Sequence, residues 1–322
     1  MASGKFDVRV CALTIVAALA LAAGMLVTLV PTAAGASSCT VSNARTHTIF
    51  NTLQAAVDAA RARDTLEVGG RCVGNTTVAK DIAIRGEAGP GIPTVDGGGV
   101  GTVIHITRGT TTIQGLKITN GVANVESVEG NPCCVGGGIA ISGSRAGARL
   151  VDSLVTGNSA SVFGGGIDVD DGTLTLENST VTENTASSSG GIDSDFGTIT
   201  LVDSTVSENV ATGGGTCTSA NLSCAGGIWN FGGALTLIDS TVSGNTADNR
   251  GGGLVNQLST GLLTLSGTST ISSNTAGEFG GGIWIRDDAT ISATGDWTGS
   301  ISGNTPDQCF PTVTIGSIIC GA

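Results

Sequence analysis

The sequence predicts a single-stranded right-handed parallel β-helix, an all-β solenoid closed at its N-terminal end by a capping helix. Three motifs predict this fold because they recur in phase along the chain. They are a glycine triplet before an aliphatic residue, a Leu-x-Asp-Ser type of segment, and a single asparagine. The aliphatic residues after the glycines are Ile139, Ile167, Ile192, Ile228, Leu254 and Ile283, at intervals of 28, 25, 36, 26 and 29 residues.

Short segments such as Thr173–Leu176 and Thr198–Leu201 alternate threonine with an aliphatic residue, the pattern of strands that bury one face. No segment after residue 62 has a helical period, so other strands must cover that face. Stacked repeats provide the cover, since each strand then pairs in parallel with its equivalent about 4.8 Å away. Glycine permits the tight corners. We expect the asparagines to form an internal hydrogen-bonded ladder: Asn158, Asn184, Asn209, Asn245, Asn274 and Asn304.

The composition agrees with one folded domain. The 322 residues include 52 Gly but only 6 Pro, and 40% are hydrophobic, enough for a narrow continuous core. A solenoid lengthens without dividing, so we expect one domain over residues 37–322, with regular repeats at about 136–305 and a C-terminal cap at 306–322. The net charge of −12 disfavours nucleic acid or an anionic membrane surface as a partner.

Residues 1–36 are predicted to be a signal peptide. Lys5 and Arg9 precede the apolar segment Cys11–Val30, and the small residues at 34–36 offer a cleavage site. The alternative is a retained anchor, because the apolar segment approaches the ~20 residues that span a bilayer. Both interpretations predict an exported protein, secreted or at the cell surface, that contacts a membrane only through an uncleaved N-terminal segment.

The cysteines also indicate export. One of the 9 Cys lies in the leader, and the even number that remains is typical of disulfides in an exported chain. Only 2 His are present and no cysteine spacing suits zinc. The expected pairs are Cys39–Cys72, Cys217–Cys224 and Cys309–Cys320. Cys133 and Cys134 then either form a vicinal disulfide or stay reduced.

A capping helix is expected at about 48–63. Ile49, Phe50, Leu53 and Val57 fall on one face at helical spacing. An amphipathic helix at this point would cover the open end of the first coil and shield its strand edges from water.

Several segments resemble a known superfamily. Leu53–Val57, Ile82–Gly86 and Thr94–Gly97 are similar to the opening of pectate-lyase-like right-handed β-helix proteins. The units Val206–Asn209 and Val242–Asn245, with the glycine motifs, resemble polymorphic outer membrane protein repeats, although valine stands where that family has phenylalanine. The resemblance implies the β-helix fold, and far less about function.

The same resemblance raises the question of carbohydrate chemistry. A polysaccharide lyase needs a basic residue beside a calcium ion held by carboxylates, yet only Arg250 and Arg286 are basic from Leu150 onward. The histidine signatures of β-helical polygalacturonases are also absent. A polysaccharide lyase or glycoside hydrolase, acting on a surface or plant polysaccharide, is therefore the alternative function.

The candidate site lies on the strand that follows the glycines. If the aliphatic residue points inward, the first and third residues after it face solvent. Stacking would bring carboxylates of adjacent coils ~5 Å apart, close enough to shift one another's pKa or to share a cation. The first position reads Ala140, Asp168, Asp193, Trp229, Val255 and Trp284, and the third reads Ser142, Asp170, Asp195, Phe231, Gln257 and Arg286.

Two kinds of residue on this strip have candidate roles. The candidate catalytic residues, which also form a candidate calcium site, are Asp168, Asp170, Asp193 and Asp195. Flat aromatic faces beside carboxylates suit a glycan, so the candidate ligand-binding residues are Trp229, Phe231, Trp284 and Arg286. No cofactor other than calcium is implied. The structural alternative is a solvated acidic sheet whose tryptophans cover a neighbouring loop.

We therefore expect an adhesin-like or glycan-binding scaffold, a monomer whose partner is a polysaccharide or a host or cell-surface glycan. A third interpretation is an ice-binding surface on another sheet, where a threonine column recurs. Only Thr173 and Thr198 complete its two-threonine rows, and β-sheet propensity explains the threonines without ice. The column consists of Thr175, Thr200, Thr236 and Thr264.

Overall fold

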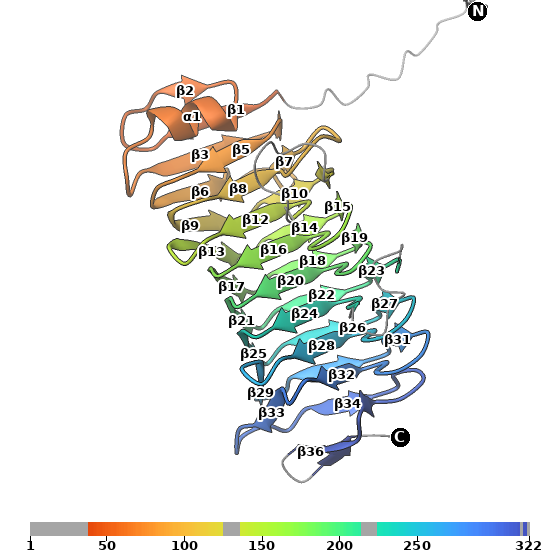
Figure 1. Cartoon of the computed structure of the whole chain (residues 1–322). Coiled ribbons are helices and arrows are strands. Elements are labelled where there is room, and N and C mark those ends of the chain that lie inside the picture. The colour runs from red at the N-terminus through yellow and green to blue at the C-terminus, as the bar shows by residue number, and fades with distance from the viewer. Residues whose placement is uncertain (1–37, 125–135, 214–223, 316–317, 321–322) are drawn as a thin grey trace, which may run out of the picture. The chain divides into compact units, whose positions relative to one another are not determined.

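The computed structural model describes residues 38–124, 136–213, 224–315 and 318–320. These residues form an all-β arrangement in which long sheets of parallel strands are built from successive repeats (Figure 1). The prediction of parallel strands in repeats is confirmed. The leader at 1–36 and the residues Cys133, Cys134 and Cys217 lie outside the described residues.

Four sheets take their strands from successive repeats, in the chain order A, B, D, C. Sheet A contains β2 (Ile49–Phe50), β1 (Thr40–Asn43), β3 (Thr65–Gly69), β6 (Ile82–Gly86), β9 (Gly109–Gln114), β13 (Ala146–Val151), β17 (Thr173–Glu177), β21 (Thr198–Val202), β25 (Ala234–Ile238), β29 (Leu262–Ser266) and β33 (Thr290–Ala293). Sheet B contains β4 (Arg71–Val73), β7 (Thr94–Asp96), β10 (Lys117–Thr119), β14 (Leu154–Thr156), β18 (Thr180–Thr182), β22 (Thr205–Ser207), β26 (Thr241–Ser243), β30 (Thr270–Ser272) and β34 (Ser300–Ser302).

The other two sheets complete each repeat. Sheet D contains β11 (Val122–Ala123), β15 (Ser159–Ala160), β19 (Thr185–Ala186), β23 (Val210–Ala211), β27 (Thr246–Ala247) and β31 (Thr275–Ala276). Sheet C contains β5 (Thr76–Val78), β8 (Ile104–Ile106), β12 (Ile139–Ser142), β16 (Ile167–Asp170), β20 (Ile192–Asp195), β24 (Ile228–Phe231), β28 (Leu254–Gln257), β32 (Ile283–Arg286) and β35 (Cys309–Phe310). A hairpin of β36 (Val313–Ile315) and β37 (Ile318–Cys320) follows.

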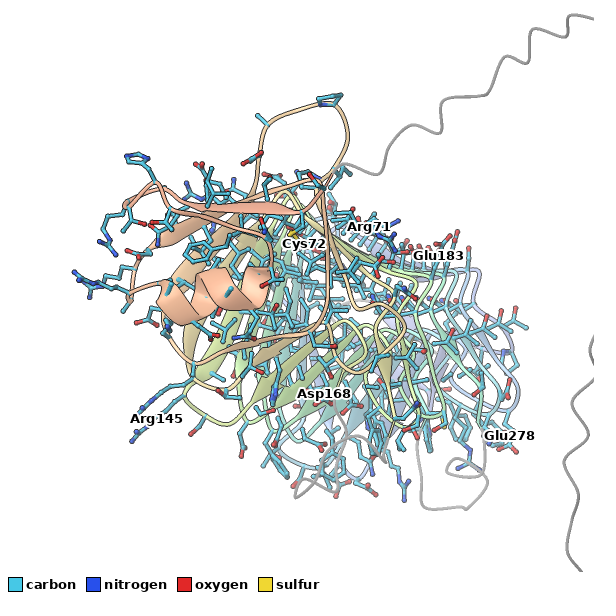
Figure 2. The ribbon with its side chains drawn as sticks, turned by 90° about the horizontal axis from the view of Figure 1, so that it is seen from above. Arg71, Cys72, Arg145, Asp168, Glu183 and Glu278 are labelled. Carbon is cyan, nitrogen blue, oxygen red and sulfur yellow. A yellow bond between two sulfur atoms is a disulfide. The ribbon has the colours of Figure 1, made fainter. Side chains whose placement is uncertain are left out.

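Strands of successive repeats pair in register, so equivalent residues lie above one another in columns (Figure 2). In sheet C, Ile167 pairs with Ile192 and Asp168 with Asp193. Alternate side chains point inward, as the period of two requires. Aliphatic residues from sheets A, B and C thereby form one continuous buried core, to which Leu174 of sheet A belongs.

Each glycine of the triplet has its own steric reason, as the repeat at 164–166 shows. Gly164 has a φ of +59°, and a Cβ there would lie 2.8 Å from the Cβ of Asp168. A Cβ on Gly165 would lie 2.4 Å from a carbonyl oxygen of the next repeat. A Cβ on Gly166 would lie 2.9 Å from the side-chain nitrogen of Asn184. The triplet therefore allows a corner, a neighbouring coil and an internal side chain to approach closely.

The six repeat asparagines lie in one buried column. From Asn158 through to Asn304, each Nδ2 donates to the Oδ1 of the next asparagine at 2.9–3.0 Å. That Oδ1 also accepts from the backbone N–H of the preceding asparagine. Gly121 donates to the first side chain, and Gln308 accepts from the last. The ladder thus satisfies a buried backbone N–H in each of these coils.

A second internal ladder lies at the corner between sheets A and B, and the sequence analysis did not foresee it. Each serine hydroxyl donates to a carbonyl oxygen of its own chain segment. Each serine after the first accepts from the backbone N–H of the preceding one at 3.1–3.2 Å. The serines of the Leu-x-Asp-Ser type of segment, joined by one serine from another segment, therefore serve the same purpose as the asparagines. The members are Ser153, Ser179, Ser204, Ser240 and Ser269.

The capping helix is shorter than predicted. α1 spans Leu53–Ala59. The preceding β2 pairs antiparallel with β1, so the chain is extended where the helix was expected to begin. Thr52 caps the helix, because its side chain accepts from the N–H of Ala55. The expected helix at 48–63 is wrong at both ends, and Ile49 is 68% exposed instead of facing the core.

Two predicted disulfides are present, Cys39–Cys72 and Cys309–Cys320. The first joins the segment before β1 to β4 of the first repeat, and the second joins β35 to β37. Each cross-links one end of the stacked strands, where strands lack a neighbour on one side. The third predicted pair, Cys217–Cys224, has one member outside the described residues.

Asp64 is the polar centre of the N-terminal cap. Its carboxylate accepts hydrogen bonds from the side chain of Asn43 and the backbone N–H of Arg61, and pairs with Arg45 at 2.6 Å. The hydrogen bond from Arg45 is the largest of several that favour the charged form. They hold the pKa of Asp64 well below its ordinary value.

Replacing Asn209 with Leu removes the middle of the asparagine ladder. The backbone N–H and side-chain amide of Asn184 then lose their acceptor, and the Oδ1 of Asn245 loses its side-chain donor, all in buried surroundings. We expect the free energy of unfolding to fall by about 1–3 kcal/mol, measured by urea denaturation. Glu208→Gln, an exposed change beside it, should leave stability unchanged. Equal stability of Asn209→Leu and the parent would contradict the ladder.

Replacing Asp64 with Asn should destabilise the protein at neutral pH and make much less difference in acid. A folded-state pKa below the unfolded value of 3.8 contributes stability above that value, and the contribution disappears as pH falls through the folded pKa. Melting temperatures of the parent and Asp64→Asn, measured from pH 7 to pH 2, should therefore begin to approach each other below about pH 4 and differ least at pH 2. A constant difference across this range would show that the charge of Asp64 has no part in stability.

Candidate functional site

Sheet C carries both predicted columns on its outer face, away from the core, and strands β12 to β32 place their members in register. The two columns differ in what covers them. The covered column consists of the first-position residues Ala140, Asp168, Asp193, Trp229, Val255 and Trp284. The rim column consists of the third-position residues Ser142, Asp170, Asp195, Phe231, Gln257 and Arg286.

The covered column is buried, and the expectation that it faces solvent is wrong. Trp229 and Trp284 are only 7% and 6% exposed, and Asp168 and Asp193 are buried as well (Figure 2 labels Asp168). The cause is the turn that leads into each strand of sheet C. In three of these turns the first glycine lies directly against the residue four positions later, as Gly280 does against Trp284, so the turn folds back over the column.

Aromatic contacts hold these turns in place. Phe163, in the turn before β16, contacts Trp229 on β24, with ring centroids 5.5 Å apart. Arg250, in the turn before β28, places its guanidinium carbon 5.0 Å from the Trp284 ring centroid and pairs with Glu278. The tryptophans belong to a small apolar cluster outside the main core. They are therefore anchors for the turns, and they present no open face to a sugar.

The C-terminal end of the rim column is occupied by internal contacts. Arg286 pairs with Asp287 at 3.3 Å and lies 5.7 Å from the Trp284 ring. The side-chain amide of Gln257 donates to the same Asp287 carboxylate at 2.8 Å. These internal contacts give Arg286 a structural role, in place of the ligand-binding role predicted from the sequence.

Asp193 is a deeply buried carboxyl group of the covered column, with 3% exposure. Its strand, β20, lies between β16 and β24. Phe163, in the turn before β16, contacts Trp229 on β24. Its Oδ1 has no hydrogen-bond partner within the described residues, and neither has the Nε1 of neighbouring Trp229. Burial, and then the charge of Asp195, raise the pKa of Asp193 well above its ordinary value, against a hydrogen bond from Ser189.

At β16 and β20 the rim column is exposed and carries unpaired negative charge. Asp170 and Asp195 are register partners on β16 and β20, and Asp171 follows at the corner. No hydrogen bond or ion pair to these three side chains occurs in the part of the chain that the structure describes. Desolvation is the first cause that raises the pKa of Asp170 and of Asp195. The charge of Asp171 raises the pKa of Asp170 further, and the charges of Asp170 and Asp171 raise the pKa of Asp195 further.

An exposed aromatic residue that the sequence analysis missed adjoins these carboxylates. Phe196 follows Asp195, is 54% exposed, and has a φ of +52°. Its ring contacts Phe231, with centroids 5.5 Å apart at 80°, and lies over Gly232, where an added Cβ would be 2.6 Å from the ring. One side of the ring is thus supported and the other is open to solvent.

A sequence signal for Phe196 exists. A bulky residue with positive φ is uncommon, so an aromatic residue at a corner position is informative. Equivalent corners of other repeats carry Asp171, Gly232, Leu258 and Asp287. We call this surface the acidic–aromatic corner, and it consists of the exposed Asp170, Asp171, Asp195 and Phe196 and the half-buried Phe231.

The carboxylates do not fit the calcium ion that the sequence suggested. Calcium takes about six to eight oxygen ligands around one point. Among the described residues, no group of three or more His, Cys, Asp or Glu side chains is arranged to hold a metal ion. Asp168 and Asp193 lie beneath the turns, whereas their neighbours Asp170 and Asp195 face solvent.

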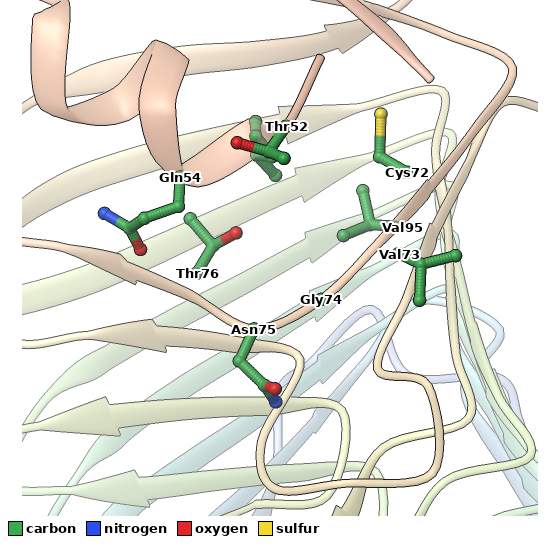
Figure 3. A pocket seen from close by; sticks show the side chains of 9 residues that line it. Thr52, Gln54, Cys72, Val73, Gly74, Asn75, Thr76 and Val95 are labelled. Carbon is green, nitrogen blue, oxygen red and sulfur yellow. The ribbon is translucent and has the colours of Figure 1, made fainter. Parts of the chain in front are cut away.

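Two cavities near the N-terminal cap offer less chemistry. One, of about 160 Å³, lies beside α1 (Figure 3) and is lined by no charged side chain. Its polar groups bond within the protein, since Gln54 accepts from the N–H of Thr77 and Asn75 donates to the carbonyl of Val100. The other, of about 390 Å³, is lined by the loop at 87–94 and by Arg71, which is engaged in a salt bridge.

Comparison with protein-family models, curated proteins and solved structures finds no match for this chain. Within the described ranges, no helix combines the length and the apolar character needed to cross a bilayer. The chemistry of the acidic–aromatic corner is therefore the basis for the function proposed below.

Replacing Asp193 with Asn should stabilise the protein at neutral pH. A carboxyl group whose folded-state pKa lies above the unfolded value of 3.8 loses stability as pH rises from the unfolded towards the folded pKa. Asparagine keeps the shape and carries no charge. We expect a higher melting temperature for Asp193→Asn at pH 7 and little difference from the parent at pH 3. A lower melting temperature at pH 7 would mean that the buried carboxyl group stabilises the fold.

Proposed function

We propose that this protein is an exported right-handed parallel β-helix of the pectate-lyase-like kind, serving as an adhesin-like, glycan-binding scaffold at the cell surface or in the medium. The acidic–aromatic corner is its glycan-binding surface. One observation carries the proposal: the ring of Phe196 is supported from one side, open on the other, and flanked by free carboxylates. Apolar faces of sugars stack on such rings, and sugar hydroxyls donate to carboxylates.

The β-helix part of the proposal draws on the order of the sheets. Each full repeat passes through sheets A, B, D and C before returning to A, and the aliphatic residues of A, B and C share one core. Parallel strands joined by crossovers are right-handed in nearly all known cases. A chain that returns to the same sheet once per repeat, always in the same direction, is expected to wind as a closed right-handed coil.

Export is supported by the disulfides. Disulfides such as Cys39–Cys72 and Cys309–Cys320 are typical of proteins in an oxidising compartment. The leader-like composition of residues 1–36 agrees with passage out of the cytoplasm. A rigid, cross-linked stack with a long surface suits a protein that presents a binding site outside the cell.

Catalysis is the second candidate, and one observation favours it. Asp195 has a raised pKa and lies in register beside Asp170, and a pair of neighbouring carboxyl groups is the usual catalytic pair of glycoside hydrolysis. If this candidate is right, the protein should release reducing ends from a bound polysaccharide, and Asp195→Asn should abolish the release while retaining the polysaccharide. A parent protein that binds without cleaving leaves the scaffold as the function.

Replacing Phe196 with Ala tests the scaffold proposal. Loss of one stacked face, roughly 60 Å² of apolar contact, corresponds to about 1.5 kcal/mol, so retention on the binding polysaccharide should weaken about tenfold. Retention on a panel of insoluble plant and microbial polysaccharides measures it. Phe279→Ala, at another partly exposed ring, is the matched control and should bind as the parent does. Equal retention by both variants and the parent would place the binding surface elsewhere.

A further inference from the structure

The acidic–aromatic corner favours a ligand with positive charge. From Leu150 onward only Arg250 and Arg286 are basic, and both are engaged, with Glu278 and Asp287 respectively. The carboxylates of the corner therefore form no salt bridge within the described ranges. A polyuronate or a sulfated glycan would meet like charge on approach, whereas a cationic chain would be attracted.

Two unpartnered polar atoms lie next to the corner, and they are a second, independent indication of a ligand. The Oδ1 of Asp193 and the Nε1 of Trp229 belong to register partners on β20 and β24, both more than nine-tenths buried. Asp193 and Asp195 project from the same face of β20, being two residues apart, so the buried carboxyl group adjoins the exposed one. Trp229 offers an N–H donor, and Asp193 offers an oxygen.

An amino sugar supplies the complement of this mixed set. Its ammonium group has three N–H donors for carboxylate oxygens, and its hydroxyls can accept from an indole N–H. An ammonium group also interacts with aromatic faces such as those of Phe196 and Phe231. Unlike calcium, it does not require a closed cage of oxygen ligands, which the described part of this surface lacks.

We infer that the glycan bound at the acidic–aromatic corner is a polycationic amino-sugar polymer, a chain of hexosamine units with free ammonium groups. The inference rests on the proposed glycan-binding function and names its ligand class. The ammonium groups lie against Asp170, Asp171 and Asp195, and one sugar face stacks on Phe196. Directly behind them, beneath the turns, lie the unpartnered Oδ1 of Asp193 and Nε1 of Trp229, and Asp193 adds a second carboxyl group next to Asp195.

Calorimetric titration with three probes tests the ligand class. The probes are an oligomer of β-1,4-linked glucosamine, its fully N-acetylated counterpart of the same length, and an oligogalacturonate. We expect the glucosamine oligomer to bind at least tenfold more tightly than the acetylated one at low ionic strength. High salt should reduce this difference in affinity, because salt screens the attraction between exposed charges. The oligogalacturonate should not bind.

Three variants separate this site from the general attraction between an acidic protein and a polycation. Asp195→Asn should lose the preference for the glucosamine oligomer, whereas Glu208→Gln, which removes one exposed charge beside sheet B, should keep it. Asp193→Asn should also bind the glucosamine oligomer more weakly. Its melting temperature at pH 7 should not be lower than that of the parent, which separates lost binding from lost folding.

The remaining outcomes can be told apart. If Asp195→Asn and Glu208→Gln lose the preference for the glucosamine oligomer equally, the preference comes from net charge alone and the inference is overturned. Equal affinity for the acetylated and deacetylated oligomers, with both dependent on Phe196, would overturn the inference and leave the glycan-binding function standing. Failure of every probe and of the polysaccharide panel to bind would overturn both.

Discussion

The contact on which the rest of the structure depends is the approach of the third triplet glycine to the ladder asparagine of its own coil. A Cβ on Gly166 would lie 2.9 Å from the Nδ2 of Asn184. In the other five repeats, a Cβ on the equivalent glycine would lie 2.7–3.0 Å from the Nδ2 of its ladder asparagine. The absent side chain lets the amide reach the corner, where it bonds the coil below and the coil above. This contact sets the register of every coil, because a slip of one residue would place an aliphatic side chain against that amide.

Much of the stacking could be predicted from the sequence, because a register that occurs in six repeats gives the sequence a regular period. The glycines, the asparagines and the inward aliphatic residues all follow from it. The burial of Trp229 and Trp284 does not, since alternation tells which face a side chain is on and nothing about a turn that folds over that face. The helix bounds failed for a related reason: the apolar face of residues 49–57 is equally compatible with a short β2 before a capped helix. Phe196 was missed because a corner residue belongs to neither column.

In-register stacking has opposite consequences for amides and carboxylates. An amide carries both donors and an acceptor, so a column of asparagines satisfies itself, as Asn184 and Asn209 show at 3.0 Å. An ionised carboxylate has only acceptors, so in-register stacking brings like charges together without a hydrogen bond between them. Burial is the largest cause of the raised pKa values of Asp170, Asp193 and Asp195, and the stacked carboxylate of Asp170 raises the pKa of Asp195 further. Asp64 experiences the reverse, because three different donors converge on it.

The repeats themselves show that the stacked carboxylates are not required by the fold. At the rim position, other coils carry Ser142, Phe231 or Gln257, and at the covered position they carry Ala140 or Val255, all within the same strand geometry. Aspartate occupies both positions only on the two adjacent strands β16 and β20. A residue type that weakens the stack, although neutral alternatives fit, is typical of a functional site, where stability is given up for binding or chemistry. The supported ring of Phe196, in a backbone conformation that bulky residues seldom adopt, directly follows β20, the second of these strands. Two independent departures from what the stack favours, adjacent on one edge of sheet C, are more readily explained by a ligand than by folding.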